Sequence, residues 1–289
     1  MAKKKVTASV FSQRQLTENI YDMWIETDLA KEALPGQFLM VYPKCAATLL
    51  PRPISICEAQ RDVGRLRIVY RVAGKGTAEF ASYRKGDPIS VMGTLGNGFP
   101  LQEAAGKRVF LMGGGIGIPP LLGLARALSG AGQISVKEAE RASGECADIS
   151  VGDGRTGDTA PLSVHAILGY RDNRLFLKED FDHYSNVVIA TEDGSAGTKG
   201  NILNAVNANG LSADLIYACG PMPMLRAVKQ YAAKEGIPAY LSLEERMACG
   251  VGACLGCVCK TTHKDAHSHV NNARVCTEGP VFLAEDVEI

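Results

Sequence analysis

The sequence E-E-R-M-A-C-G-V-G-A-C-L-G-C-V-C-K occupies residues 244–260, and A-R-V-C-T-E-G-P-V-F follows at residues 273–282. Three of its cysteines stand in a C-x4-C-x2-C pattern, and a later one follows after eighteen further residues. The four are Cys249, Cys254, Cys257 and Cys276. This is the spacing of plant-type [2Fe–2S] ligation, and the interleaved glycines let backbone N–H groups approach sulfur closely. The pattern therefore predicts a [2Fe–2S] cluster held by these four thiolates.

Two other interpretations of the cysteines stay open. Four thiolates also suit a structural zinc ion, although zinc sites favour two separated C-x2-C pairs over one triple run and a distant single residue. The other alternative is a set of unliganded thiols. A disulfide framework is not expected in a chain of 289 residues without a secretory signal. Cys259 lies only two residues beyond Cys257, a spacing that orients both side chains poorly toward one metal pair, so we expect it not to be a ligand.

Length and composition limit the class of protein. The 289 residues predict two to three domains with sizeable cores. The formal net charge is zero and the charges are mixed, which indicates neither a nucleic-acid nor a membrane-surface partner. No apolar run reaches the length of a membrane span, and the lysines at residues 3–5 lack the apolar stretch of a signal peptide. Nine cysteines without such a signal predict a reducing, cytoplasmic setting.

The first hundred residues predict an antiparallel β-barrel or sandwich, because short alternating segments are separated by turn signals. The expected strands, within a region that begins at Val6, lie at residues 20–27, 37–42, 53–58, 65–72 and 88–92. A short helix is expected at Thr77–Tyr83. The run R-P-I-S at residues 52–55 and the G-K-G-T turn at residues 74–77 together predict a phosphate clamp and a hydroxyl facing a flavin, although each taken singly also fits an ordinary turn.

The middle of the chain predicts a doubly wound parallel α/β domain. A buried strand at residues 106–112 is followed by G-G-G-I-G-I-P-P at residues 113–120 and a helix at residues 121–128. Dinucleotide phosphates bind at such strand–turn–helix junctions. Pro120 replaces the last glycine of the G-x-G-x-x-G pattern, so a simple tight turn remains an alternative.

Later segments of the same region alternate between strands and helices. Strands are expected at residues 164–169, 186–191 and 214–219, and an amphipathic helix at Met222–Glu235. The C-G-P-M run at residues 219–222 falls at the carboxyl end of a strand, where ligands bind in such sheets. Residues 129–163 are polar and weakly periodic, which predicts a surface insertion in which Cys146 is not a ligand.

The R-P-I-S strand and the turns described above resemble those of the ferredoxin–NADP reductase-like superfamily. The resemblance implies an FAD-binding barrel over residues 1–101, an NAD-binding domain over 102–239 and a cluster domain over 240–289. It implies that FAD is bound by Arg52, Pro53, Ser55, Tyr70, Arg71, Val72, Gly76 and Thr77. It places Gly115 and Gly117 at the NAD pyrophosphate, and Cys219, Gly220 and Pro221 beside the nicotinamide. The superfamily motif often has an aromatic residue where this chain has proline and isoleucine, which fits only some branches.

The order of the motifs along the whole chain resembles the electron-transfer subunits of two-subunit, NAD-linked dihydroorotate dehydrogenases. Only residues 129–163 and 263–272 depart visibly from that pattern. The resemblance implies a heterotetramer with an FMN-containing dihydroorotate dehydrogenase catalytic subunit, in pyrimidine biosynthesis. Electrons are then expected to pass from dihydroorotate through the partner's FMN to the cluster, FAD and NAD. The cofactors carry this chemistry, so no catalytic side chain is predicted.

Other functions remain open at this point. A flavin and iron–sulfur subunit of a bifurcating transhydrogenase or sulfhydrogenase shares the architecture, and a zinc-stabilised binding module is a more distant alternative. Arg171 follows the second strand and suits a 2′-phosphate, while no acidic residue is obviously placed for a ribose, so NAD and NADP are not distinguished. The apolar residues Val251, Ala253 and Leu255 suit either a docking patch or packing of the loop on its own domain.

Overall fold

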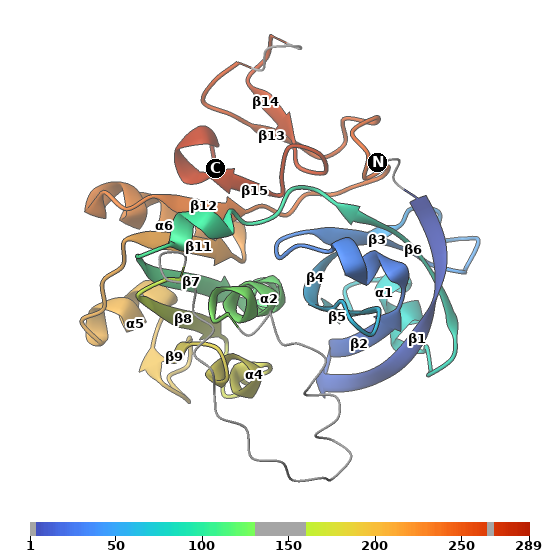
Figure 1. Cartoon of the computed structure of the whole chain (residues 1–289), viewed down its shortest axis with the longest axis horizontal. Coiled ribbons are helices and arrows are strands. Elements are labelled where there is room, and N and C mark those ends of the chain that lie inside the picture. The colour runs from blue at the N-terminus through green and yellow to red at the C-terminus, as the bar shows by residue number, and fades with distance from the viewer. Residues whose placement is uncertain (1–3, 131–159, 265–268) are drawn as a thin grey trace.

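The computed structural model describes residues 4–130, 160–264 and 269–289. A β-barrel lies beside a layered sheet with helices, and a cysteine-rich segment lies against both (Figure 1). The predicted insertion at residues 129–163 and the stretch at residues 263–272 fall partly outside the described residues, and Cys146 falls wholly outside them. In the part of the chain that the structure describes, no helix has the length and apolar character needed to cross a membrane.

The first six strands form a closed antiparallel barrel, as predicted. In order around the barrel they are β1 (Lys4–Thr17), β2 (Ile20–Glu26), β5 (Arg65–Arg71), β4 (Arg52–Gln60), β3 (Phe38–Tyr42) and β6 (Pro88–Leu95). Alternate side chains fill the interior, among them Met23, Leu39 and Ile68. The helix α1 (Lys75–Ala81) begins two residues before the predicted start, because Thr77 Oγ1 accepts hydrogen bonds from the backbone of residues 73 and 74 and so turns the chain early.

A seven-stranded sheet forms the second layer, with the doubly wound order that the sequence predicts. In order across the sheet its strands are β10 (Thr198–Lys199), β9 (Asn186–Thr191), β8 (Ser163–Tyr170), β7 (Arg108–Gly114), β11 (Leu215–Cys219), β12 (Ala239–Ser242) and β15 (Val281–Leu283). Neighbouring strands are parallel, apart from the antiparallel pair β12 and β15. The sheet therefore presents several carboxyl strand ends at one edge, where a nucleotide can bind.

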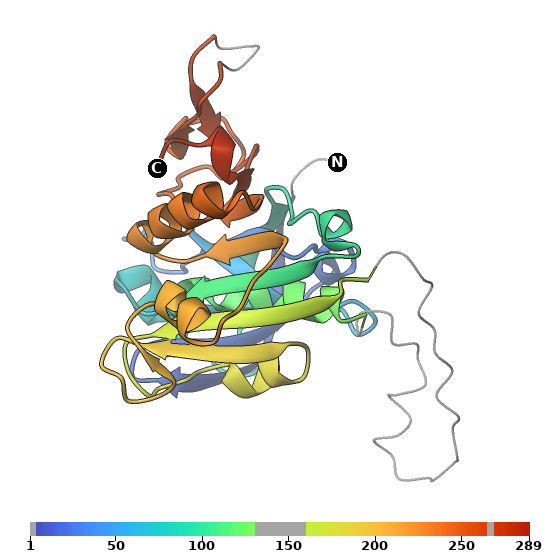
Figure 2. The same cartoon turned by 90° about the vertical axis from the view of Figure 1, so that its left-hand side faces the viewer.

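Helices cover both faces of this sheet (Figure 2). Val109 and Leu111 of β7 pack on the side of α2 (Pro119–Leu128) and α4 (Lys178–Asp182). Phe110 and Met112 point to the other face, which is covered by α5 (Ile202–Ala208) and α6 (Met222–Glu235). Strand β7 is therefore apolar on both faces, because helices cover it on both sides.

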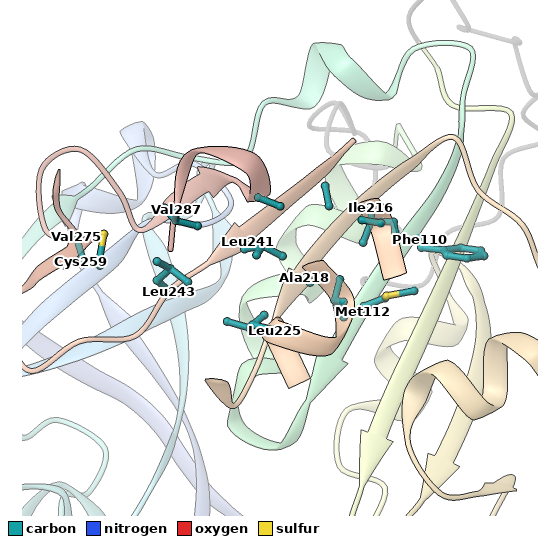
Figure 3. Close-up of a cluster of buried hydrophobic side chains, with 14 of the residues drawn as sticks. Phe110, Met112, Ile216, Ala218, Leu225, Leu241, Leu243, Cys259, Val275 and Val287 are labelled. Carbon is teal, nitrogen blue, oxygen red and sulfur yellow. The ribbon is translucent and has the colours of Figure 1, made fainter. Parts of the chain in front are cut away.

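The cysteine-rich segment shares its core with the other two layers. It contains the antiparallel pair β13 (Val258–Lys260) and β14 (Asn272–Arg274), followed by β15 and the short helix η5 (Ala284–Asp286). Val275 and Val287 continue the apolar cluster that begins under the sheet at Phe110 and Met112 (Figure 3). The predicted boundary at residues 239/240 falls inside β12, and β15 adds an edge strand to the sheet, so backbone pairing links the segment to the sheet.

A buried ion network joins the barrel to the sheet layer. Arg67 of β5 donates to Asp22 of β2 at 2.9 Å, to Glu58 of β4 at 3.4 Å and to Asp180 of α4 at 2.7 Å. Arg126 of α2 also pairs with Glu58. The Arg67 side chain is only 4% exposed. Removing one member of the network would therefore leave the charge of its partner buried, with little water to solvate it. The network therefore holds the two layers in one relative orientation.

Candidate functional site

The four predicted cluster ligands lie on one tightly turned loop and on the segment beside it. Cys257 and Cys276 are buried, Cys249 is half-buried and Cys254 is exposed. Gly250 and Gly252 have φ values of 69° and 80°, which L side chains rarely adopt. The sequence therefore places glycine where the chain must curl back around the sulfurs.

Backbone N–H groups point at the sulfurs. Val251 N–H donates to Cys249 Sγ at 3.4 Å, and Gly256 N–H donates to Cys254 Sγ at 3.4 Å. A third donation crosses between the two segments, from Gly252 N–H to Cys276 Sγ at 3.2 Å. These donors favour the thiolate form, which is the form that binds iron.

The four thiols interact electrostatically, Cys249 with Cys254, and Cys276 with both Cys257 and Cys249. Burial raises the pKa of Cys249, but N–H groups from Val251 and its neighbours, together with the Cys254 thiol, lower it more, to about 6. Burial and the neighbouring Cys257 raise the pKa of Cys276 to about 12. Within the described residues no three Cys, His, Asp or Glu side chains surround one point where a single ion could sit. The order and spacing of the four cysteines still favour a [2Fe–2S] cluster over a zinc ion.

Cys259 shares the buried apolar cluster with two of the proposed ligands, Cys257 and Cys276. It lies on β13 opposite Ala273, and its buried side chain belongs to the apolar core (Figure 3). Burial raises its pKa to about 11, so it carries the neutral thiol of a core residue at neutral pH. Burial does not separate Cys259 from these two ligands, so its place outside the ligand set stays a prediction from the cysteine spacing.

The cysteine loop packs directly on the barrel. A methyl group built on Gly250 would lie 2.7 Å from Cγ of Met40 on β3 and 3.2 Å from Cδ1 of Leu95 on β6. Tyr42, at the end of β3, has its pKa raised by burial and by the nearby Cys249 sulfur. The backbone of Gly250 therefore lies directly against the Met40 and Leu95 side chains of the barrel wall, with no room for a side chain at position 250.

The structure brings Arg52 and Gly76 together, as the predicted phosphate clamp requires. A methyl group on Gly76 would lie 3.0 Å from Arg52 Nε, so the guanidinium lies over the turn that opens α1. Arg52 also donates to the carbonyl of Leu50 at 2.6 Å. The Thr77 hydroxyl is committed to the turn itself, since it also donates to Gly74 O at 3.0 Å. Pro53 and Ser55 follow Arg52 on β4 and are half-buried.

Tyr70 lies differently from the flavin-facing position that the resemblance implies. Its buried side chain points into the barrel, where it donates to Gln13 Oε1 at 2.8 Å and stacks on Tyr21 with ring centroids 5.9 Å apart. Only the main chain of Tyr70 is left to face a ligand outside the barrel. Arg71, the next residue, is exposed at the end of β5, and Val72 follows it.

Two glycine turns meet at the carboxyl ends of β7 and β11. A methyl group on Gly117 would lie 2.5 Å from the carbonyl carbon of Cys219 and from Gly220 Cα, so only glycine fits there. Pro221 lies 3.2 Å from the Cβ position of Gly114. Gly115 has φ of 53° and no other atom within 4 Å of its Cβ position. The predicted nicotinamide and pyrophosphate residues therefore lie together, where the strand order reverses.

A cavity of about 270 Å³ opens beside Gly115, between the barrel and the sheet. Arg71 lines it from the barrel, and Arg171, Asp172 and Arg174 line it from the end of β8. Asp172 accepts from Arg174 Nε at 2.9 Å, and this hydrogen bond lowers the Asp172 pKa to about 2. The sequence analysis missed this acidic residue. Its signal was available, because an acidic residue after the second strand of such a sheet binds a ribose.

Glu244 is a second residue that the sequence analysis did not single out. It follows β12 and interacts electrostatically with Cys219 and Arg71, which belong to opposite sides of the site. Its side chain is exposed, yet the surrounding protein reduces its hydration and raises its pKa, while Arg71 opposes that change. Burial and Glu244 together raise the Cys219 pKa to about 12, so the thiol is neutral at physiological pH.

Residues 244–288 match the family model of the iron–sulfur cluster binding domain of dihydroorotate dehydrogenase B. The chain is 40% identical over 283 residues to the electron transfer subunit of dihydroorotate dehydrogenase B (NAD(+)) from Bacillus caldolyticus, with 96% of each chain covered. It is 39% identical over the same length to that subunit from Geobacillus kaustophilus, also with 96% of each covered.

Solved structures show the same fold. The structure of an NADH-dependent reduced ferredoxin–NADP oxidoreductase, described for flavin-based electron bifurcation, aligns with a TM-score of 0.77 and 26% identity, covering 97% of this chain and 89% of that one. A ferredoxin NADP+ reductase from Neisseria gonorrhoeae aligns with a TM-score of 0.58 and 16% identity, covering 81% of this chain and 92% of that one.

Proposed function

This chain belongs to the family of dihydroorotate dehydrogenase B electron transfer subunits, and we propose that it carries electrons between the catalytic subunit of that enzyme and NAD+. The observation that carries the proposal is the direct contact between the four-cysteine loop and the barrel at Gly250 and Met40. When bound, a nicotinamide supplies two-electron hydride chemistry, a [2Fe–2S] cluster supplies single electrons, and FAD supplies both kinds. The chain's own residues bind, orient and separate these groups.

Cys249, Cys254, Cys257 and Cys276 are the proposed cluster ligands. The N–H donors of Val251, Gly252 and Gly256 support this assignment, because they offset the negative charge that thiolate ligands bring to the loop.

For FAD, we propose that Arg52 binds the phosphates beside the turn at Gly76 and Thr77. An arginine suits a pyrophosphate better than a lysine does, because its guanidinium is always charged and presents several hydrogen-bond donors. Pro53 and Ser55 would line the flavin from β4, with the Ser55 hydroxyl toward the isoalloxazine. The other proposed flavin contacts come from the end of β5, through the main chain of Tyr70 and through Arg71 and Val72.

For NAD, we propose that the dinucleotide lies across the two glycine turns. Gly115 and Gly117 would approach the pyrophosphate, and Cys219, Gly220 and Pro221 would flank the nicotinamide. A neutral Cys219 thiol supports a packing role there rather than a nucleophilic one. Asp172 in the adjacent cavity would accept from a ribose hydroxyl, while Arg71, Arg171 and Arg174 line the same cavity, so the proposed preference for NAD rests on the family and not on the charge of this cavity.

The proposed partner is the FMN-containing dihydroorotate dehydrogenase catalytic subunit, in a heterotetramer. Val251, Ala253 and Leu255 are exposed on the cysteine loop, which supports docking by this apolar face. The proposed location is the cytoplasm, since cluster ligation requires cysteines kept reduced.

Co-expression with an FMN-containing dihydroorotate dehydrogenase chain tests the function. The complex should purify intact and reduce NAD+ when dihydroorotate is added. This chain alone, loaded with FAD and cluster, should oxidise NADH with an artificial acceptor and leave dihydroorotate untouched. If the native protein instead purifies with a hydrogenase or a large multi-cluster subunit, the bifurcating alternative replaces this proposal.

A further inference from the structure

The eight residues from Cys276 to Leu283 touch all three parts of the molecule. The segment begins with a proposed cluster ligand and ends as β15, which pairs with β12 at the edge of the sheet. Between these points it lies against the turn that follows β6 of the barrel. A residue that holds the middle of this segment therefore also holds Cys276 in place against the barrel that is proposed to bind FAD.

Asn97, in the turn after β6, makes four hydrogen bonds to this segment. Its backbone N–H donates to Gly279 O at 2.7 Å. Its side-chain Nδ2 donates to Glu278 O at 3.1 Å and to Val281 O at 2.7 Å. Its Oδ1 accepts from Val281 N–H at 3.0 Å. One exposed asparagine thus uses both ends of its amide on a strand that comes from 184 residues further along the chain.

The contact is tight, because two glycines of the barrel turns lie directly against the segment and leave no room for a side chain of their own. Gly96 has φ of 74°, and a methyl group on it would lie 2.5 Å from Pro280 Cδ. Gly36, with φ of 96°, would bring a methyl group within 3.2 Å of Val281 Cγ2. Glycine at both positions lets the barrel turns lie directly against Pro280 and Val281. Neither glycine has a side chain that could rotate to accommodate a small shift of the segment.

Cys276 is rigidly connected to the residues that Asn97 binds. The N–H groups of Thr277 and Glu278 donate to Arg274 O at 3.0 Å and 2.9 Å, closing a turn around the cysteine. The Glu278 carboxylate accepts from Arg274 Nε at 3.0 Å. Val275 N–H donates to Cys257 O at 2.9 Å, which ties two ligand segments together. These hydrogen bonds therefore couple the place of the Asn97 contact to the places of Cys276 and Cys257, two of the four proposed ligands.

We propose that Asn97 is a positioning residue that holds the cluster ligand Cys276 at a fixed place against the flavin barrel. The proposal rests on the proposed function, because it assumes that electrons pass between the cluster and the flavin. Electron transfer between two centres depends steeply on their separation, so loosening this contact should slow that transfer more than it changes cofactor binding. The nicotinamide turns follow β7 and β11, and Ser242 of β12 separates Cys219 from Val281, so the rate of flavin reduction by NADH is measured as a separate readout.

The test uses the co-expressed complex with all cofactors loaded, in wild-type form and as Asn97→Ala, Asn97→Asp and Asn207→Ala. Asn207 is an exposed asparagine on α5 and serves as the matched control. Stopped-flow absorbance with NADH separates bleaching of the flavin from bleaching of the cluster. Amide hydrogen exchange reports separately on residues 276–283.

Asn97→Ala should keep its iron and FAD, reduce its flavin at the wild-type rate and reduce its cluster about tenfold more slowly. It should also lose exchange protection at residues 276–283. Asn97→Asp fills the same space but cannot donate to the two carbonyls, so it should share the defect, whereas Asn207→Ala should not. Wild-type cluster reduction and exchange in Asn97→Ala would overturn the proposal. If wild-type cluster is not reduced by NADH at all, the proposed function fails, and the exchange data still report on Asn97.

Discussion

The environment of each sulfur separates one cysteine of this chain from another. Backbone N–H donors around Cys249 hold its pKa near 6, whereas burial raises the pKa of Cys259 to about 11 and that of the proposed ligand Cys276 to about 12. Cys219 is buried beside Glu244 and is also held neutral. Among these four thiols, ionisation at neutral pH is favoured at Cys249, and the ligand role of Cys276 rests on the spacing of the motif.

Replacement of single cysteines tests which of them are cluster ligands. Cys276→Ser should lose the cluster, because a buried hydroxyl is a poor substitute for a thiolate ligand. Cys259→Ser should keep it, at a stability cost of about 1–3 kcal/mol for a hydroxyl placed in an apolar core. Iron content and visible absorbance of the purified variants measure the outcome. Cluster loss in Cys259→Ser together with a normal Cys276→Ser protein would exclude the ligand assignment.

Arg52 permits a second test at a single side chain. Arg52→Ala removes charge-assisted hydrogen bonds worth about 1.5–3 kcal/mol, so FAD should bind roughly ten- to hundredfold more weakly. Arg84→Ala is the control, since Arg84 also donates to nearby carbonyls on the barrel but lies away from the R-P-I-S strand. Flavin content after gel filtration measures occupancy. Full flavin in Arg52→Ala would place the phosphate clamp elsewhere.

At the scale of elements, the bounds of strands and helices with a clear apolar period could be predicted from the sequence, whereas very short strands could not. The strand at residues 186–191 and the helix at residues 222–235 have the predicted bounds, because each carries a clear apolar pattern. The strands β10 and β15 hold two and three residues, too few for any period, and only distant partners define them. The same limit applies to the site. The cysteine spacing is local and was readable, whereas the inward direction of Tyr70 depends on how its strand is set in the barrel wall.

The ion network between barrel and sheet gives a prediction at this scale. Arg67→Met keeps the aliphatic stem but leaves Asp22, which is 2% exposed, with a single partly exposed partner, and it should cost roughly 3–5 kcal/mol. Arg65→Met is the control on the same strand. It breaks a pair with Glu26 that is open to water and removes the guanidinium from the Phe11 ring, so it should cost about 1–2 kcal/mol, less than Arg67→Met. Urea unfolding midpoints of the two variants compare these costs, and equal midpoints would contradict the role of the network.

At the scale of the whole molecule, one apolar core passes through all three parts. Met40 of the barrel, Phe110 of the sheet and Val275 of the cysteine segment belong to the same buried cluster. A change in the cysteine segment therefore reaches the other layers through packing. The barrel keeps a separate core of its own around Met23 and Ile68, which should make it less sensitive to such a change.

Removal of the cluster tests this coupling. Iron chelation under reducing conditions should lower the melting temperature, because metal binding free energy contributes to folding of the segment that holds it. Amide exchange should rise across residues 244–283 and at β12, while β1 and β2 keep their protection. Exchange that rises equally in the barrel, or nowhere, would show that the parts are coupled differently.

The antiparallel pairing of β15 with β12 has a consequence for biosynthesis. A ribosome completes the strands from β7 to β12 well before it makes residues 281–283, so a nascent chain carries the sheet with one open edge. Unpaired edges recruit other strands and promote aggregation. Closing that edge requires the segment that also delivers Cys276. Maturation of the metal site and protection of the newly made sheet are therefore the same late event, and chains that stop before residue 281 should be poorly soluble even with FAD present.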